Sequence, residues 1–376
     1  MGKPKVMFVV GTRPDAIKTA PVVLEFQKHE RVETVLVSTG QHREMLAQAL
    51  EAFGLRPAVD LAVMRHEQTL AELTARVLAG LDEVIVDVAP DYILAQGDTT
   101  TTFCASLAAF YRRIPYGHIE AGLRTETVSN PFPEEFNRRT TSLVAKHHFA
   151  PTRWAANNLL REGYCQESIF VTGNTGIDAV LDVAARGEQT WYPDFEGRVV
   201  LLTTHRRENW GAPQDRIARA ARTIVDEVPD TLLVVPMHRN PQVRESLKRR
   251  LGGHDRVQLI EPPDYSEFVK LMQRSYLILT DSGGVQEEAP AFGVPVLVLR
   301  DTTERPEGVE AGSARLVGTV EASILTASRE LLSDPESRAK MAKTRSPYGD
   351  GRASQRIRSV VLPFLGIECE PESPWG

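Results

Sequence analysis

The sequence lacks the features of several specialised protein classes. It has no apolar run of about 18 residues or more, so a transmembrane helix is not expected. Its three cysteines, Cys104, Cys165 and Cys369, are too few and too widely spaced for a disulfide framework or a metal knuckle. Acidic residues outnumber basic ones by 50 to 44, so neither a nucleic acid nor a membrane surface is an expected partner. The remaining composition is that of a globular protein.

Targeting and cofactor signatures are also missing. The N-terminus passes from Lys3-Pro4-Lys5 directly into an apolar strand without a leader pattern, so we expect a cytoplasmic protein with reduced thiols. No G-x-G-x-x-G follows a predicted strand, which disfavours a nicotinamide, and we expect no cofactor. His118 and Glu120 have a spacing that suits a metal, but no third ligand joins them. No metal site is therefore expected.

Apolar strands alternate with helical segments along the whole chain. Strands are predicted near 5–10, 34–38, 92–96, 114–119, 147–150, 169–172, 198–203, 231–236, 256–260, 276–280, 295–299 and 314–317. This alternation predicts an α/β protein with two parallel, doubly wound sheets. The polar residues 186–197 are read as the linker region. We place an N-terminal domain at 1–172, with a C-terminal helix within 351–376 packing back on it, and a second domain at 173–350.

Residues 276–300 read as a strand, a sharp turn, a short helix and another strand. Asp281 or Ser282 is predicted to cap the helix. Residues 282–284 put almost no side chain in front of the first helical amides, so a diphosphate could approach the backbone there. Glu288, one turn further on, suits the hydroxyls of a ribose. An ordinary capped turn gives the same pattern, so this turn alone does not identify a ligand site.

Polar clusters follow many of the predicted strands. They are Arg13, residues 40–43, Asp98, Glu120, residues 203–208, His238 and residues 282–284. In open α/β sheets, ligands bind beyond the carboxyl ends of the strands. Their shared position favours a functional site over a set of unrelated caps and solvated side chains.

Eight motifs, in their order along the chain, resemble the non-hydrolysing UDP-N-acetylglucosamine 2-epimerase family. They are GTRPDAIK at 11–18, TGQHREML at 39–46, QGDTTTT at 96–102, HIEAGLRT at 118–125, PFPEEFNR at 131–138, THRREN at 204–209, PMHRNP at 236–241 and DSGGVQEEAP at 281–290. The resemblance implies a glycosyltransferase-B-like fold, with two Rossmann-like domains facing a cleft. It also implies a homodimer that interconverts UDP-GlcNAc and UDP-ManNAc. Asp15 departs from the family pattern, which has Glu there, and Glu67 stands where relatives often have a basic residue.

The resemblance also implies three sets of site residues. The catalytic set is Asp98, Glu120, Glu134 and His205. The UDP-binding set is Arg13, Lys18, Ser282, Gly283, Gly284 and Glu288, although a lysine in a first helical turn can simply be solvated. A regulatory UDP-GlcNAc site would use Gln41, His42, Gln68, Arg206 and His238. Asp98 is expected to act as a base or an electrostatic stabiliser, Glu120 and Glu134 to move protons, and His205 to donate to the leaving phosphate or assist proton transfer.

Epimerisation at C2 of an N-acetylhexosamine requires breaking a C–H bond that is not α to a carbonyl. Loss of UDP from C1 makes this proton acidic, and elimination followed by re-addition from the other face gives the epimer. This is the route that the resemblance implies. Three alternatives stay open: a glycosyltransferase of the same fold, a hydrolysing epimerase that releases ManNAc, and a UDP-sugar sensor without turnover.

Overall fold

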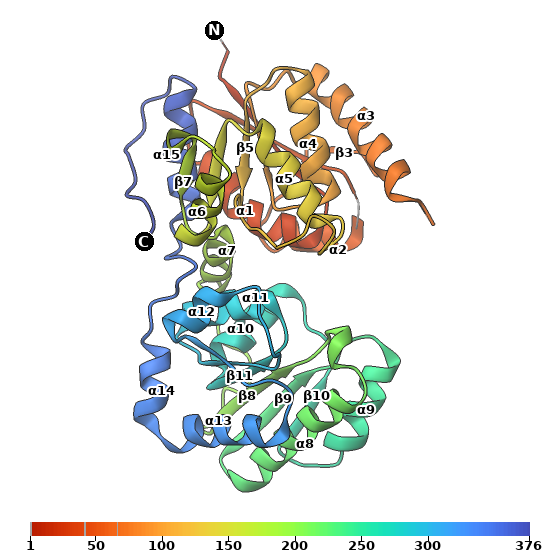
Figure 1. Ribbon diagram of the computed structural model, residues 1–376, viewed down its shortest axis with the longest axis vertical. Coiled ribbons are helices and arrows are strands. Elements are labelled where there is room, and N and C mark those ends of the chain that lie inside the picture. The colour runs from red at the N-terminus through yellow and green to blue at the C-terminus, as the bar shows by residue number, and fades with distance from the viewer. Residues whose placement is uncertain (1, 41–42, 66) are drawn as a thin grey trace. The chain divides into compact units, whose positions relative to one another are not determined.

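The computed structural model describes residues 2–40, 43–65 and 67–376, and it divides the chain into two compact units (Figure 1). The first unit comprises Met1–Ala179 and Gly349–Gly376, and the second comprises Val180–Tyr348. The C-terminal segment therefore returns to the first unit after the second is complete. No helix of the described residues is long and apolar enough to cross a membrane.

The first unit contains a parallel sheet with helices on both faces. In chain order its elements are β1 (Lys5–Val10), α1 (Arg13–Gln27), β2 (Glu33–Ser38), α2 (Arg43–Glu51), β3 (Val59–Asp60), α3 (Leu70–Val88), β4 (Tyr92–Gln96), α4 (Thr100–Tyr111), β5 (Tyr116–Ile119), α5 (Glu134–Val144), β6 (His147–Ala150), α6 (Arg153–Arg161), a 3₁₀ turn (Gln166–Ser168), β7 (Ile169–Val171), α7 (Thr175–Ala184) and, after the second unit, α15 (Ala353–Phe364). Helices α3, α4 and α5 pack together, whereas α1 packs against α2 and α15.

The second unit repeats this plan. Its elements are β8 (Arg198–Thr203), a 3₁₀ turn (Arg207–Asn209), α8 (Ala212–Glu227), β9 (Thr231–Pro236), α9 (Pro241–Leu251), β10 (Val257–Ile260), α10 (Tyr265–Arg274), β11 (Leu277–Thr280), α11 (Gly283–Glu288), a 3₁₀ turn (Ala289–Phe292), β12 (Val296–Val298), α12 (Pro306–Ala311), β13 (Ala314–Leu316), α13 (Glu321–Ser333) and α14 (Pro335–Ala342). Its core joins the sheet to α8, α9 and α13 through buried Leu, Ile, Val and Ala side chains.

Both sheets are doubly wound in the same order. The first runs β3-β2-β1-β4-β5-β6-β7 and the second β10-β9-β8-β11-β12-β13, and the paired strands are parallel. The strand order reverses between β1 and β4 in the first sheet and between β8 and β11 in the second. Such a switch point opens a crevice at the carboxyl ends of the strands, where ligands of this fold class bind. The predicted pair of doubly wound sheets is confirmed.

The sequence prediction missed four elements. β3 has two residues and α12 has six, so neither gives a readable period. The sequence pattern also does not reveal α7 and α14, since α7 precedes the predicted linker and α14 opens with Pro335 directly behind α13. The short helix predicted after β11 begins at Gly283.

Candidate active site

In the first unit, the turn after β1 is tied to the turn after β4. Thr12 caps α1, and the Asp15 carboxylate accepts hydrogen bonds from the amides of Gly11 and Thr12 at 3.2 and 3.1 Å. Asp15 also accepts a bond from the Thr99 hydroxyl at 3.1 Å, across the switch point. Burial raises the pKa of Asp15 to about 6, although these hydrogen bonds oppose the shift. Asp15 therefore joins the turn that carries Arg13 to the turn that carries Asp98.

The two predicted cations of α1 have different surroundings. Lys18 forms an ion pair with Glu120 and is only 17% exposed, so the solvated alternative is wrong for this lysine. Arg13 is half-buried and has no hydrogen bond or ion pair to any side chain in the ranges 2–40, 45–65 and 67–376. Its guanidinium therefore has all its donors available for an external anion, whereas Lys18 shares its charge with Glu120.

Glu120 follows β5 in a strained backbone conformation. Its φ of +67° lies in the left-handed region, which costs a non-glycine residue about 1–3 kcal/mol. Besides Lys18, its carboxylate accepts a hydrogen bond from Gln96 Nε2 at 2.5 Å. Ligand-binding and catalytic residues are over-represented among such outliers.

Asp98 and Glu134 complete the predicted carboxylates of this unit. Asp98 forms an ion pair with Arg138 of α5. Glu134 is the first residue of α5 and is half-exposed. Among the side chains that the structure describes, it has no hydrogen-bond or ion-pair partner. The three carboxylates thus differ: Asp98 pairs with arginine, Glu120 with lysine, and Glu134 is open to a ligand.

His118 forms a hydrogen bond with the turn that carries Asp98. Its Nε2 lies 2.7 Å from the carbonyl oxygen of Gly97, and the ring is fully buried. Burial lowers the pKa of His118 to about 3, so the ring is neutral and Nε2–H donates to Gly97. The ring therefore faces Gly97 while Glu120 faces Lys18. Within the described residues, no group of three or more His, Cys, Asp or Glu side chains is arranged to hold a metal ion.

In the second unit, Asp281 organises the turn after β8. This fully buried carboxylate accepts hydrogen bonds from the amides of His205 and Arg206, both at 3.0 Å, and from Asn209 Nδ2 at 2.9 Å. His205 Nδ1 lies 3.2 Å from its other oxygen. Burial raises the pKa of Asp281, but the bonds from His205 and its neighbours outweigh burial and lower it. The predicted helix-capping role of Asp281 is wrong, because its acceptors face β8 instead of α11.

The turn after β11 leaves helical amides uncovered. Ser282 is the N-cap of α11, but its side chain makes no capping hydrogen bond, so only its position agrees with the prediction. Gly283 is buried and Gly284 is exposed. A Cβ built on Gly283 would lie 3.7 Å from Nη2 of Arg206. This guanidinium therefore lies beside the turn, where it adds positive charge to the free amides.

A hollow of about 200 Å³ opens beside this turn. It is lined by Thr203, Thr204, His205, Pro236, His238, Pro262, Phe268, Ser282 and Val285. The rings of His205 and His238 stack with centroids 6.1 Å apart. Our sequence reasoning missed the apolar lining, above all Phe268 of α10, because it lies in an ordinary amphipathic helix and carries no motif signal.

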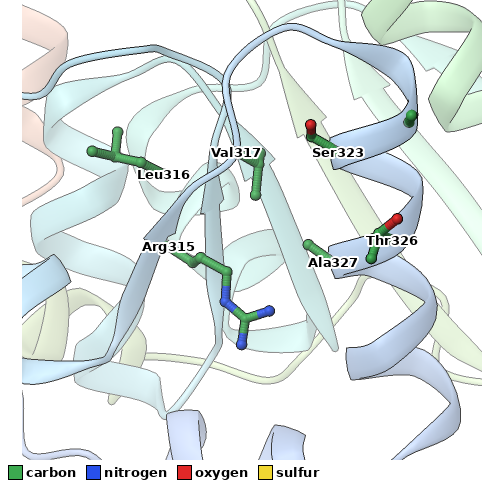
Figure 2. Close-up of a pocket in the computed structure, with 7 residues that line it drawn as sticks. Arg315, Leu316, Val317, Ser323, Thr326 and Ala327 are labelled. Atoms are coloured by element: carbon green, nitrogen blue, oxygen red, sulfur yellow. The ribbon is translucent and has the colours of Figure 1, made fainter.

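The described members of the predicted regulatory set are divided between the two units. Gln41 and His42 lie outside the described residues. Gln68 belongs to the first unit, where its side chain accepts hydrogen bonds from Arg65 and Arg76. Arg206 and His238 belong to the second unit. A further hollow of about 470 Å³ between β13 and α13 contains none of the predicted residues, and its Arg315 is paired with Glu330 (Figure 2).

The sheets of the two units define the class to which this protein belongs. Two doubly wound parallel sheets, each with charged side chains at its switch point, make this a Rossmann-like two-domain α/β protein of glycosyltransferase-B-like fold. Residues 24–362 match the family model described as UDP-N-acetylglucosamine 2-epimerase. The chain belongs to this family, as its eight motifs predicted.

Individual relatives cover nearly the whole chain. A UDP-N-acetylglucosamine 2-epimerase of Bacillus subtilis is 51% identical over 99% of both chains. The UDP-GlcNAc 2-epimerase of Neisseria meningitidis bound to UDP-GlcNAc is 46% identical, with a TM-score of 0.86 over 96% of this chain and 100% of that one. The S. aureus MnaA–UDP co-structure is also 46% identical, with a TM-score of 0.87 over 99% and 100%.

Proposed function

We propose that this protein interconverts UDP-GlcNAc and UDP-ManNAc by elimination and re-addition of UDP. A base removes the C2 proton while the C1–O bond to UDP breaks, and the released electron pair forms the C1–C2 double bond of 2-acetamidoglucal. UDP then adds back to C1, and an acid delivers a proton to the opposite face of C2. The observation that carries this proposal is that Asp98, Glu120 and Glu134 belong to the same unit as Arg13 and Lys18, with Lys18 paired to Glu120. This route needs proton-transfer groups as well as cations.

The different surroundings of the carboxylates support different roles. Glu134, without a partner among the described side chains, is suited to exchange a proton with substrate. Glu120 forms an ion pair with Lys18, and we assign it the second proton transfer. Asp98 is paired with Arg138 and is assigned as the base or stabiliser of the charge that builds at the sugar.

The second unit supplies the nucleotide-binding groups in this proposal. The turn of Ser282, Gly283 and Gly284 binds the diphosphate, with the free amides of Gly283 and Gly284, and Glu288 takes the ribose hydroxyls. The apolar side of the hollow beside this turn, with Phe268, takes the nucleotide base. Arg13 and Lys18 bind phosphate oxygens as UDP departs, and His205 donates to the leaving oxygen.

The decisive experiment is incubation with UDP-GlcNAc in D₂O without any acceptor, followed by NMR at C2. We expect UDP-ManNAc with deuterium at C2, together with a trace of 2-acetamidoglucal and UDP. Free ManNAc as the main product would instead indicate hydrolysis, and turnover only with an added acceptor would indicate a glycosyltransferase. Binding of UDP-GlcNAc without any of these products would leave a sensor.

Assembly, location and regulation belong to the same proposal. Four exposed apolar side chains on α4 and α5, namely Phe110, Tyr111, Phe136 and Leu143, favour a homodimer through these helices. Light scattering of the wild type and of Leu143→Asp tests this, since loss of an apolar contact should yield monomers.

A cytoplasmic location agrees with three free cysteines. A regulatory UDP-GlcNAc site would make UDP-ManNAc a poor substrate until UDP-GlcNAc is added.

A further inference from the structure

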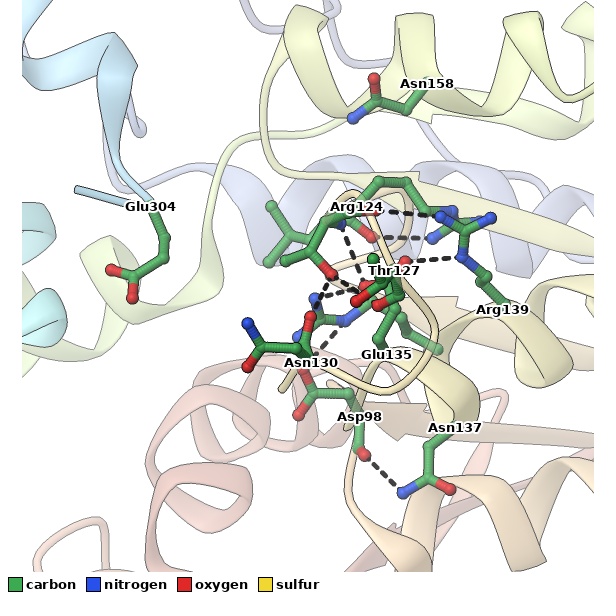
Figure 3. Close-up of polar contacts among 12 residues, drawn as sticks. Asp98, Arg124, Thr127, Asn130, Glu135, Asn137, Arg139, Asn158 and Glu304 are labelled. Carbon is green, nitrogen blue, oxygen red and sulfur yellow. Dashed lines mark hydrogen bonds and ion pairs between the residues drawn. The ribbon is translucent and has the colours of Figure 1, made fainter. Parts of the chain in front are cut away.

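Helix α5 holds the Asp98 turn at three points. Asn137 Nδ2 donates to the Asp98 carbonyl oxygen at 2.8 Å (Figure 3). Arg138 donates twice to the carboxylate, from Nε at 3.1 Å and from Nη2, and both bonds end on Oδ2. Within residues 2–40, 45–65 and 67–376, no side chain or amide donates to Oδ1. One oxygen of Asp98 is therefore anchored and the other is open.

A buried carboxylate fixes the arginine from behind. Glu135 is 0% exposed, and its Oε2 accepts hydrogen bonds from Arg138 Nη1 at 2.9 Å and from the Thr125 amide at 3.1 Å. Its Oε1 accepts a bond from Arg139 Nε at 2.6 Å. Figure 3 shows Glu135 and Arg139 within this polar cluster. Arg138 thus has carboxylates on both sides of one planar guanidinium, which leaves it little rotational freedom.

Arg138 keeps its positive charge although it is largely buried. Its side chain is only 12% exposed. Burial lowers the pKa of Arg138, but the negative charges of Asp98 and Glu135 outweigh burial and raise it. The neighbouring Arg139 also binds Glu135 but does not contact Asp98, and it donates to the Thr125 carbonyl at 3.0 Å instead. The two consecutive arginines therefore share a carboxylate and differ in what else they hold.

We propose that Arg138 is a positioning residue for the epimerisation, which anchors Oδ2 of Asp98 so that Oδ1 alone faces the substrate. This proposal rests on the proposed role of Asp98. A carboxylate that is free to rotate would present either oxygen over a range of directions, and proton transfer or charge stabilisation falls steeply with misplacement. Glu135, next in sequence to the predicted catalytic Glu134, supports this geometry from the same face of α5, one helical turn before Arg138.

A double-mutant cycle tests the proposal. The proteins are the wild type, Asp98→Asn, Arg138→Met and the double variant, with Arg139→Met as the matched control. Methionine keeps much of the arginine stem and removes the donors and the charge. For each protein, kcat and KM are measured in both directions, the UDP affinity by calorimetry, and the urea midpoint by circular dichroism. Arg138→Lys, which restores the charge with a single donor group, measures rescue.

We expect Arg138→Met to lower kcat by up to about 100-fold, with KM and UDP affinity little changed. Arg139→Met should stay close to the wild type, and Arg138→Lys should recover part of the loss. In the Asp98→Asn background, Arg138→Met should lower kcat by less than about twofold more, because the group it positions is already disabled. The same cycle with Arg138→Gln replaces any Met variant that does not fold.

Two results would overturn the positioning role. One is an equal loss of kcat in Arg138→Met and Arg139→Met, which would mean that the cluster only stabilises the fold. The other is the full Arg138→Met loss in the Asp98→Asn background. Failure of the proposed function gives a different result: Asp98→Asn itself would then turn over like the wild type. The two failures are therefore distinguishable.

Discussion

Replacing Asp281 by asparagine should destabilise the second unit strongly. Two backbone amides donate to Oδ2, so a carboxamide oxygen keeps them only if its N–H₂ group takes the place of Oδ1, which lies 3.1 Å from the His205 amide. A buried donor left without an acceptor costs about 1–3 kcal/mol. With that buried N–H₂ group facing the His205 amide, and the bonds from His205, Arg206 and Asn209 no longer charge-assisted, we expect a loss of about 2–5 kcal/mol in the free energy of unfolding.

The assay is urea unfolding followed by tryptophan fluorescence. Trp154 and Trp375 of the first unit are changed to phenylalanine, so that only Trp191 and Trp210 of the second unit report. At about 2 kcal/mol per M of urea, the midpoint should fall by about 1–2.5 M. The fluorescence of Trp210 should report on this turn, because its indole N–H lies 3.4 Å from the carbonyl oxygen of His205, whose amide donates to Asp281.

The pH dependence gives a second check. Folding lowers the pKa of Asp281, so its contribution is present above the unfolded value of about 4 and is lost as the pH falls through the folded value. The gap between wild type and variant should therefore narrow in acid. Asp301→Asn, the same change at an exposed position, is the control. Equal midpoints for Asp281→Asn and Asp301→Asn at pH 7 would refute the reasoning.

Three further predictions follow from other contacts. Asp98→Asn should reduce turnover by about 10²–10⁴-fold and leave UDP binding by calorimetry intact; full activity would remove Asp98 from the mechanism. Because folding lowers the pKa of His118 to about 3, its stabilising contribution decreases as the pH falls below about 6.5, so His118→Gln should lose about 2 kcal/mol less stability than wild type between pH 7 and 5. Asp178→Ala removes the acceptor of the Ala353 and Ser354 amides, so hydrogen exchange at the start of α15 should accelerate; unchanged protection there would contradict this contact.

The sequence was informative about where polar groups lie along the backbone. Strand ends are readable because buried parallel strands are apolar throughout and stop at glycine or charged residues. Asp98, Glu120 and residues 282–284 were located in this way, and the structure has each of them beyond a strand. Their roles in binding and catalysis rest on the family motifs and stay predictions.

The sequence did not indicate which side chains form hydrogen bonds or ion pairs with one another. Asp281 and its donors at 204–206 are more than 70 residues apart, and Arg138 lies 40 residues from Asp98. No periodicity links such pairs, because they meet only through the strand order of the sheet. For the same reason Glu135 and Phe268 carried no signal, since a carboxylate or a phenylalanine in a helix has many ordinary roles.

In both units, a buried aspartate accepts hydrogen bonds from the donors at the switch point of the sheet. At a switch point, the connections that follow the two neighbouring strands run in opposite directions. Backbone amides just beyond the strand ends therefore have no hydrogen-bond partner in the sheet. In the first unit Asp15, after β1, accepts the amides of its own turn and the hydroxyl of Thr99, after β4. In the second unit Asp281, after β11, accepts the amides of His205 and Arg206, after β8. A buried aspartate at each switch point therefore satisfies the orphaned donors and fixes the turns that carry Asp98 and His205. Because both carboxylates accept hydrogen bonds from the turns at their own switch points, we assign their buried charges to the scaffold and not to proton transfer.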